Sequence, residues 1–145
     1  MHSTVAEPRR FVDSNVLVYA VAADAGEKQR KAAAIVERGF AERCYVISTQ
    51  VLMEVFVTVT RKVKTPLLPE QALAYMIALA QWPVVTLSPG LALQAAELSV
   101  RARISPWDAA IVCAAAAAGC EVLLTEDMAP GVCYLGVRVV NPFCS

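Results

Sequence analysis

The stretch that decides the fold is Phe11-Val12-Asp13-Ser14-Asn15-Val16-Leu17-Val18-Tyr19. Two apolar residues lead directly into an acidic residue, and an apolar run with helical spacing follows Ser14. The pattern predicts a short buried strand that ends at Asp13 and a helix that begins at Ser14. A carboxylate there lies at the carboxyl edge of a strand, where open α/β sheets bind their ligands. The alternative is that Asp13 only caps the helix or closes an Asx turn.

Strand and helix patterns alternate along the rest of the chain. We expect strands at residues 10–13, 44–47, 84–87, 120–124 and 137–140. We expect helices at residues 14–22, 27–40, 49–62, 69–81, 89–103 and 106–119, with N-caps at Ser48 or Thr49, Ser88 and Ser105. This alternation predicts an α/β fold with a central parallel sheet of four or five strands and helices on both faces.

Composition narrows the class of protein further. A chain of 145 residues fits one domain, 1–145, in which we interpret residues 1–8 as a loose N-terminal leader. A hydrophobic content of 57% calls for a large buried sheet or a partner that covers one face. The net charge of +0 is not typical of a general nucleic-acid binder, so any such contact has to be local.

The same composition bears on the compartment. No apolar run is long enough to span a membrane, which takes about 20 residues. The 5 cysteines are odd in number and form no C-x-x-C motif, which argues against a disulfide framework or a zinc site. We therefore expect a cytoplasmic protein whose cysteines are small buried thiols.

Two acidic residues lie on predicted helices. Glu54 belongs to the one polar stripe of an otherwise apolar helix, so the stripe faces either a cavity or solvent. Asp108 completes a Ser-Pro-Trp-Asp capping pattern, and the helix that follows has no polar residue from 109 to 118. That helix should be buried, and a carboxylate at its start can cap it and also point into a site.

A further acidic pair follows the predicted strand at 120–124. Asp127 comes after Thr125, which again places a carboxylate at the carboxyl edge of a strand. A solvated turn explains the pair equally well, and the periodicity leaves open whether Glu126 or Asp127 points inward.

In a parallel sheet, Asp13, Glu54, Asp108 and Asp127 can converge on one edge. Carboxylates ~5 Å apart repel each other by roughly 3 kcal/mol per pair at an effective dielectric near ~20. A fold keeps such a group either by raising the pKa values or by binding a divalent cation. Oxygen ligands that leave room for water suit Mg²⁺ or Mn²⁺, and the chemistry that such an ion supports is phosphodiester hydrolysis.

Four motifs in this order resemble those of the PIN-domain ribonucleases, in particular the VapC-like toxins of type II toxin–antitoxin pairs. They are Asp-Ser-Asn-Val-Leu, Glu54 in an apolar helix, Ser-Pro-Trp-Asp-Ala-Ala-Ile, and Leu-Leu-Thr-Glu-Asp. The resemblance implies a PIN-like α/β fold and an endoribonuclease that needs Mg²⁺ or Mn²⁺. It also implies an RNA substrate, a homodimer, and a small antitoxin protein that occludes or disrupts the acidic site.

The resemblance assigns residues to roles. The family's acidic residues, which hold the metal and carry catalysis, correspond to Asp13, Glu54, Asp108 and Asp127, with Glu126 in reserve for the fourth position. Supporting polar groups are Asn15 and Thr125. Basic residues that could contact RNA phosphates are Arg61, Lys62, Lys64, Arg101 and Arg103. Solvated helix ends explain each of these basic residues equally well.

Other interpretations stay open at this point. An acidic cleft could instead bind a basic partner segment without catalysis. A Mg²⁺-dependent phosphoacceptor domain would need a lysine at a strand end, where Ser48, Leu87 and Thr125 are expected instead. Trp107 could stack on a base, although core packing is the favoured interpretation. The single histidine, His2, lies in the expected leader, so we do not expect a histidine to act as general base.

Overall fold

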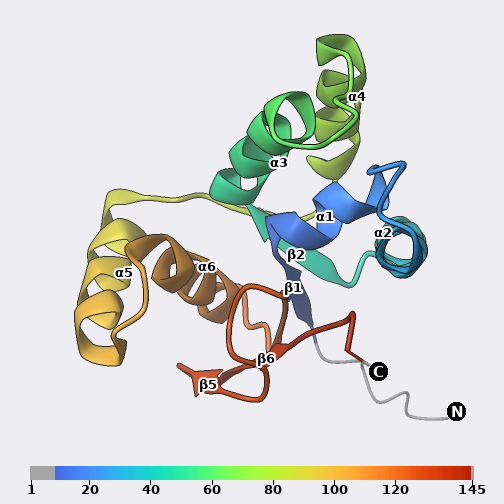
Figure 1. The fold of residues 1–145 in the computed structure, drawn as a ribbon. Coiled ribbons are helices and arrows are strands. Elements are labelled where there is room, and N and C mark those ends of the chain that lie inside the picture. The colour runs from blue at the N-terminus through green and yellow to red at the C-terminus, as the bar shows by residue number, and fades with distance from the viewer. Residues whose placement is uncertain (1–8, 145) are drawn as a thin grey trace, which may run out of the picture.

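The computed structural model describes residues 9–144, which form a central sheet with helices on both of its faces (Figure 1). The strands are β1 (Arg10–Val12), β2 (Tyr45–Ser48), β3 (Val84–Val85), β4 (Val122–Leu124), β5 (Cys133–Tyr134) and β6 (Val137–Val140). The helices are α1 (Ser14–Ala20), α2 (Glu27–Glu42), α3 (Thr49–Arg61), α4 (Pro69–Leu79), α5 (Pro89–Ala102) and α6 (Pro106–Ala117). The predicted α/β class and the alternation of elements are therefore confirmed.

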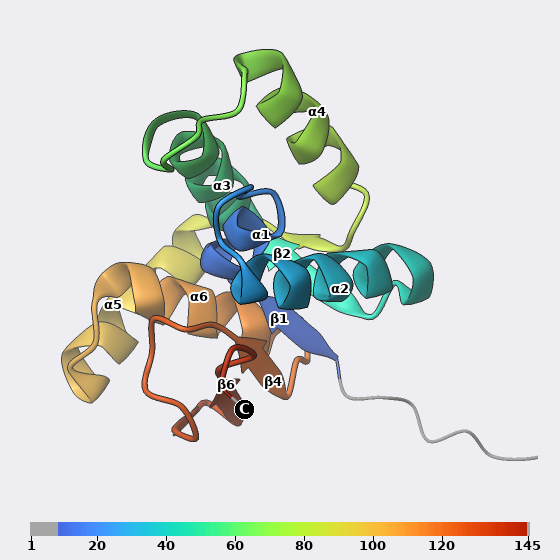
Figure 2. The same cartoon turned by 45° about the vertical axis from the view of Figure 1, so that its right-hand side comes forward.

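The order of the strands determines where a ligand can bind. The sheet has the order β3-β2-β1-β4-β6-β5, and every pair is parallel except β5 with β6. Helices α1 to α4 lie on one side of the sheet and helices α5 and α6 on the other (Figures 1 and 2). The chain builds outward from β1 to β3 and then returns to β4, so the direction of winding reverses between β1 and β4. Open α/β sheets bind ligands at the carboxyl ends of the strands at such a reversal.

Serine caps start three of the helices, as the sequence predicts. The hydroxyl of Ser48 accepts a hydrogen bond from Val51 N at 3.3 Å, and Ser88 accepts one from Leu91 N at 3.2 Å. Ser105 accepts one from Asp108 N at 3.0 Å. Each cap satisfies a backbone N–H group that has no partner inside its helix.

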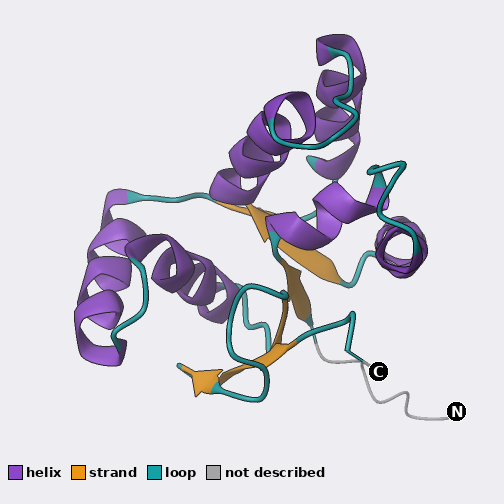
Figure 3. Ribbon diagram, in the orientation of Figure 1, coloured by secondary structure: helices purple, strands orange, loops and turns teal. Residues whose placement is uncertain are grey.

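The predicted count of four or five strands is too low, because the sheet has 6. The additional strand, β5, forms a short antiparallel hairpin with β6 at one edge of the sheet (Figure 3). Its turn places Leu135 and Gly136 at φ of 51° and 79°. Two consecutive residues with positive φ are typical of a tight hairpin turn, which usually contains Asn-Gly or Asp-Gly. Because Leu135-Gly136 is neither of these pairs, the sequence did not predict the turn.

The burial of the helices confirms one expectation and corrects another. Helix α6 is buried from Ala109 to Ala115, as expected. Helix α3 exposes part of its apolar surface, since Met53 on it is 60% exposed. Trp107 is 64% exposed, so its expected packing in the core is wrong.

The cysteines and the apolar segments complete the description. Cys113 and Cys120 are buried free thiols as expected, whereas Cys133 and Cys144 are exposed. Between residues 9 and 144, no helix combines the length and the hydropathy that a membrane crossing would need. The leader expected at residues 1–8 lies outside the described residues.

Candidate active site

Asp13 lies at the carboxyl end of β1, at the point where the sheet reverses its winding. Val12 pairs with Leu124 of β4, and Asp13 N continues the ladder by donating to Leu124 O at 3.0 Å. One carboxylate oxygen, Oδ1, accepts a hydrogen bond from Ser14 N at 2.7 Å and so caps α1. The other, Oδ2, accepts one from the hydroxyl of Thr125 at 2.9 Å. Asp13 is only 5% exposed, so its carboxylate is held rigidly inside the protein.

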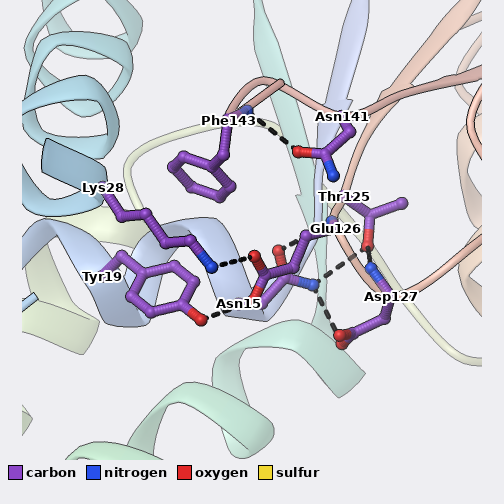
Figure 4. A network of polar contacts seen from close by, with 8 residues as sticks. All are labelled: Asn15, Tyr19, Lys28, Thr125, Glu126, Asp127, Asn141 and Phe143. Atoms are coloured by element: carbon purple, nitrogen blue, oxygen red, sulfur yellow. Dashed lines mark hydrogen bonds and ion pairs between the residues drawn. The ribbon is translucent and has the colours of Figure 1, made fainter. Parts of the chain in front are cut away.

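A second set of hydrogen bonds joins Thr125, the partner of this carboxylate, to Asn15 and Asp127 (Figure 4). Asn15 Nδ2 donates to Thr125 Oγ1 at 2.9 Å and to Asp127 Oδ2 at 3.1 Å. Asp127 N donates to Thr125 Oγ1 at 3.1 Å. Asn15 and Thr125 therefore lie between the two carboxylates and fix their relative positions.

Burial has a large effect on the ionisation of Asp13. The pKa of Asp13 rises from 3.8 to about 7, chiefly because the carboxyl is removed from water, with a smaller contribution from the charges of Glu54 and Asp127. The hydrogen bonds from Ser14 N and the Thr125 hydroxyl oppose this rise because they stabilise the ionised form. Asp13 therefore exchanges its proton near neutral pH, and a nearby cation would favour the ionised form.

Glu54 and Asp108 reach the same end of the sheet from two helices. Gln50 connects Glu54 to the start of α6, since its Nε2 donates to Glu54 Oε2 at 3.4 Å and to the backbone oxygen of Trp107, the residue before Asp108, at 3.2 Å. Burial raises the pKa of Asp108, a hydrogen bond with Ser105 lowers it, and the charge of Asp127 raises it again. All four predicted carboxylates therefore interact electrostatically at this end of the sheet.

The carboxylates do not form a closed set of metal ligands. Within residues 9–144, no three His, Cys, Asp or Glu side chains are grouped tightly enough to hold a metal ion. Mg²⁺ is commonly held by one or two carboxylates together with water and phosphate oxygens, so the chemistry of these donors still suits it.

Glu126 points away from this group and binds a different pair of residues. Its carboxylate accepts hydrogen bonds from the Tyr19 hydroxyl at 2.5 Å and from Lys28 Nζ at 2.8 Å (Figure 4). Burial alone would raise the pKa of Glu126, but the contacts with Lys28 and Tyr19 outweigh burial and lower it. The backbone N–H of Glu126 donates to Asn15 Oδ1 at 3.2 Å. Asp127 is thus the member of the pair that faces Asp13.

The predicted basic residues differ in their relation to the site. Lys62 lines a pocket of about 300 Å³ together with Ser14 and Glu54. Arg101 lines a separate pocket with Leu135 and other residues of α5 and α6, away from the carboxylates. Residues Arg61, Lys64 and Arg103 are exposed.

Three residues around the site were not among those predicted. Gln50 was visible in the sequence as part of the polar stripe of Glu54, at a spacing of four residues. Tyr19 and Lys28 had no local signal, because their partner Glu126 is 107 and 98 residues away in the chain.

Comparison with known proteins places this geometry in a family. A family model described as PIN domain matches residues 10–129. A comparison with curated protein sequences gives no match.

Solved structures with the same fold have low sequence identity. A toxin–antitoxin complex from Klebsiella pneumoniae is 22% identical with a TM-score of 0.68, and the alignment covers 92% of this chain and 98% of that chain. VapC20 of Mycobacterium tuberculosis, described as a Sarcin-Ricin loop cleaving toxin, is 21% identical with a TM-score of 0.60 and coverages of 79% and 86%. A DNA-bound VapBC from Salmonella typhimurium is 21% identical with a TM-score of 0.57 and coverages of 92% and 97%.

The family match covers most of the chain and includes all four predicted carboxylates. It begins at β1, which carries Asp13 at its end, and extends just past Asp127. The chain therefore belongs to the PIN domain family.

Proposed function

We propose that this PIN domain is an endoribonuclease that depends on Mg²⁺ or Mn²⁺ and acts as the toxin of a type II toxin–antitoxin pair. The observation that carries the proposal is the hydrogen-bonded group of Asp13, Asn15, Thr125 and Asp127 at the reversal point of the sheet. The names of the similar structures, toxin–antitoxin complexes and a Sarcin-Ricin loop cleaving toxin, support the toxin assignment.

The residues that would hold the ion are Asp13 and Asp127, with Asp108 and Glu54 acting directly or through water. The buried Asp13 supports this assignment, because a carboxylate whose pKa is raised to about 7 lacks a nearby positive charge. The chemistry that a divalent ion supplies is neutralisation of a phosphate and activation of water for in-line attack. Metal binding requires ionised ligands, so it should release the proton that Asp13 holds near neutral pH.

The protein's own side chains would position the metal-holding carboxylates and the attacking water. Asn15 and Thr125 hold Asp13 and Asp127 at fixed positions, so that little reorganisation is needed when substrate binds. Glu54, kept in place by Gln50, is the candidate for orienting the attacking water. The overall reaction adds water to phosphorus and breaks one P–O ester bond, which leaves a phosphate monoester and a hydroxyl.

The partners follow from the same proposal. A small antitoxin protein would close or disrupt the acidic end, and a homodimer is the expected assembly in the cytoplasm. Exposed apolar side chains support the presence of protein partners, since Leu73 and Ile77 on α4 are 53% and 59% exposed.

The most direct test compares two neighbouring acidic residues. We expect Asp127→Asn to lower the Mn²⁺-dependent cleavage of an RNA substrate by about 100-fold or more, because it removes a group that would hold the ion. Glu126→Gln is the matched control, since it removes the adjacent charge that Lys28 and Tyr19 hold away from the site. The control should change the rate by less than about tenfold.

Two results would overturn the proposal. Equal losses in both variants would mean that the turn matters only as structure. No cleavage by the wild-type protein with either metal ion, combined with tight binding of a basic peptide, would favour the interaction module.

A further inference from the structure

An open apolar pocket adjoins the acidic group on the side of β3. It has a volume of about 570 Å³ and is lined by Thr49, Gln50, Met53, Glu54, Leu87 and Trp107. The Trp107 side chain is 64% exposed, and Met53 beside it is 60% exposed. A large aromatic ring next to a candidate catalytic residue, Asp108, therefore offers an open flat surface.

The backbone that carries this ring is held in place. Gln50 is only 9% exposed, and both of its hydrogen-bond partners, Glu54 Oε2 and Trp107 O, are acceptors. Its amide nitrogen must therefore face them. The amide oxygen of Gln50 has no hydrogen-bond partner within residues 9–144, and Gln50 is one of the residues that line the pocket.

The pocket belongs to a longer track along α3. It shares Met53 and Glu54 with the pocket lined by Lys62, and that pocket shares Ser14 and Thr58 with a third of about 310 Å³ that reaches Asp127. The track therefore begins at an aromatic surface, passes a cation and ends at the carboxylates. This alternation suits a single nucleic-acid strand, whose bases stack on aromatic rings and whose phosphates bind cations.

We propose that Trp107 stacks on one unpaired RNA base next to the phosphate that is cleaved, and that Gln50 Oε1 accepts a hydrogen bond from that base. This inference rests on the proposed function and adds that the substrate is unpaired at this position. Sequence-specific recognition of RNA mostly targets such unstacked bases. An extended peptide fits the track less well, because helices line most of it and offer no sheet edge for backbone pairing.

Tryptophan fluorescence tests the proposal without relying on cleavage. Trp82 is 5% exposed, so acrylamide should quench mainly Trp107. In the metal-free wild-type protein, which should not cleave RNA, a short unstructured oligoribonucleotide at saturating concentration should protect Trp107 from acrylamide, and a duplex of the same sequence should not.

Affinity measurements under the same metal-free conditions identify the stacking contact. Trp107→Ala should weaken binding of the oligomer by about tenfold or more, whereas Trp107→Tyr should stay within about threefold of the parent. Leu93→Ala is the control, because Leu93 is also exposed, at 73%, but lines none of the three pockets of the track. It should bind like the parent.

Equal affinity of the parent and the Trp107→Ala variant would overturn the proposal. So would protection of Trp107 that grows with protein concentration in the absence of RNA, because a second copy of the chain would then cover the ring. Cleavage by the wild-type protein with an unchanged KM in Trp107→Ala would refute the stacking contact alone. Stacking without any wild-type cleavage would refute the proposed catalysis and leave the RNA subsite intact.

Discussion

At the scale of single residues, the Asp13 carboxylate caps a helix and also lies within the proposed site, two positions that the sequence presented as alternatives. Its Oδ1 caps α1 by accepting a hydrogen bond from Ser14 N, and its Oδ2 accepts a hydrogen bond from the hydroxyl of Thr125. Thr125 in turn accepts hydrogen bonds from Asn15 and from Asp127 N. Capping therefore orients the carboxylate and does not remove it from the site.

The raised pKa of Asp13 predicts how stability depends on pH. Because the folded pKa is about 7 and the ordinary value is 3.8, the folded state binds the extra proton between these two pH values. The contribution of Asp13 is thus fully present below about pH 4 and is lost as the pH rises through about 7. The metal-free protein should lose up to about 4 kcal/mol of unfolding free energy from this group across that window.

Urea unfolding of the metal-free protein at several pH values measures how the unfolding free energy changes with pH, which gives a slope. Asp13→Asn should flatten it, because the side chain no longer titrates. Added Mn²⁺ should also flatten it in the wild type by favouring the ionised carboxylate. A wild-type stability that rises steadily between pH 4 and 7, with no difference in Asp13→Asn, would contradict the raised pKa.

The sequence could not predict which residue of the acidic pair, Glu126 or Asp127, faces Asp13. The motif drew attention to the turn after β4, but strand periodicity ends there and could not separate Glu126 from Asp127. The structure separates them through Lys28 and Tyr19, which come from distant parts of the chain. Trp107 was misjudged for a related reason, since helical spacing does not reveal which face of the first turn is covered.

At the scale of elements, two Ser-Pro caps give a matched pair of tests. Ser88 and Ser105 each accept a hydrogen bond from the backbone three residues on, at the starts of α5 and α6. Replacing either by Ala should cost about 1 kcal/mol of unfolding free energy. Only Ser105→Ala should also lower cleavage, by roughly tenfold, because Ser105 additionally hydrogen-bonds the side chain of Asp108.

The two variants are compared by chemical unfolding and by RNA cleavage under the same conditions. An equal loss of cleavage in Ser88→Ala would show that stability, not the position of Asp108, limits activity. Unchanged cleavage in Ser105→Ala would indicate that the position of Asp108 does not matter for catalysis.

The elements themselves were largely predictable from the sequence. All six helices occur where capping residues and apolar spacing placed them, since local hydrogen bonds and periodicity dominate there. The missed strand, β5, has only 2 residues and depends on a turn with Leu135 at positive φ. A strand of that length has no periodicity to detect, so only its pairing with β6 defines it.

At the scale of the whole molecule, the strand order brings distant motifs together. Asp13 and Asp127 are 114 positions apart in the sequence, yet β1 and β4 are neighbours in the sheet. Parallel pairing and the reversal of winding explain why both carboxylates reach one edge. The sequence could predict this edge, but not the side-chain hydrogen bonds that fix the distances.

The net charge of +0 bears on RNA affinity at this scale. Only some of the predicted basic residues lie near the carboxylates, and Lys62 is the one that shares a pocket with Glu54. We therefore expect RNA affinity to depend on a few local contacts and on the bound metal ion, with weak attraction to nucleic acid in general.

The central claim is that the four carboxylates form a metal site, and a thermal melt tests it most directly. Wild-type protein and Asp13→Asn are melted near pH 7.5 with and without millimolar Mn²⁺. At about 100 times Kd, binding to the folded state adds about 2.7 kcal/mol, which corresponds to a rise in Tm of roughly 5–10 °C. We predict that rise in the wild type and its loss in Asp13→Asn. An unchanged Tm in the wild type, or an equal rise in both proteins, would contradict the metal site.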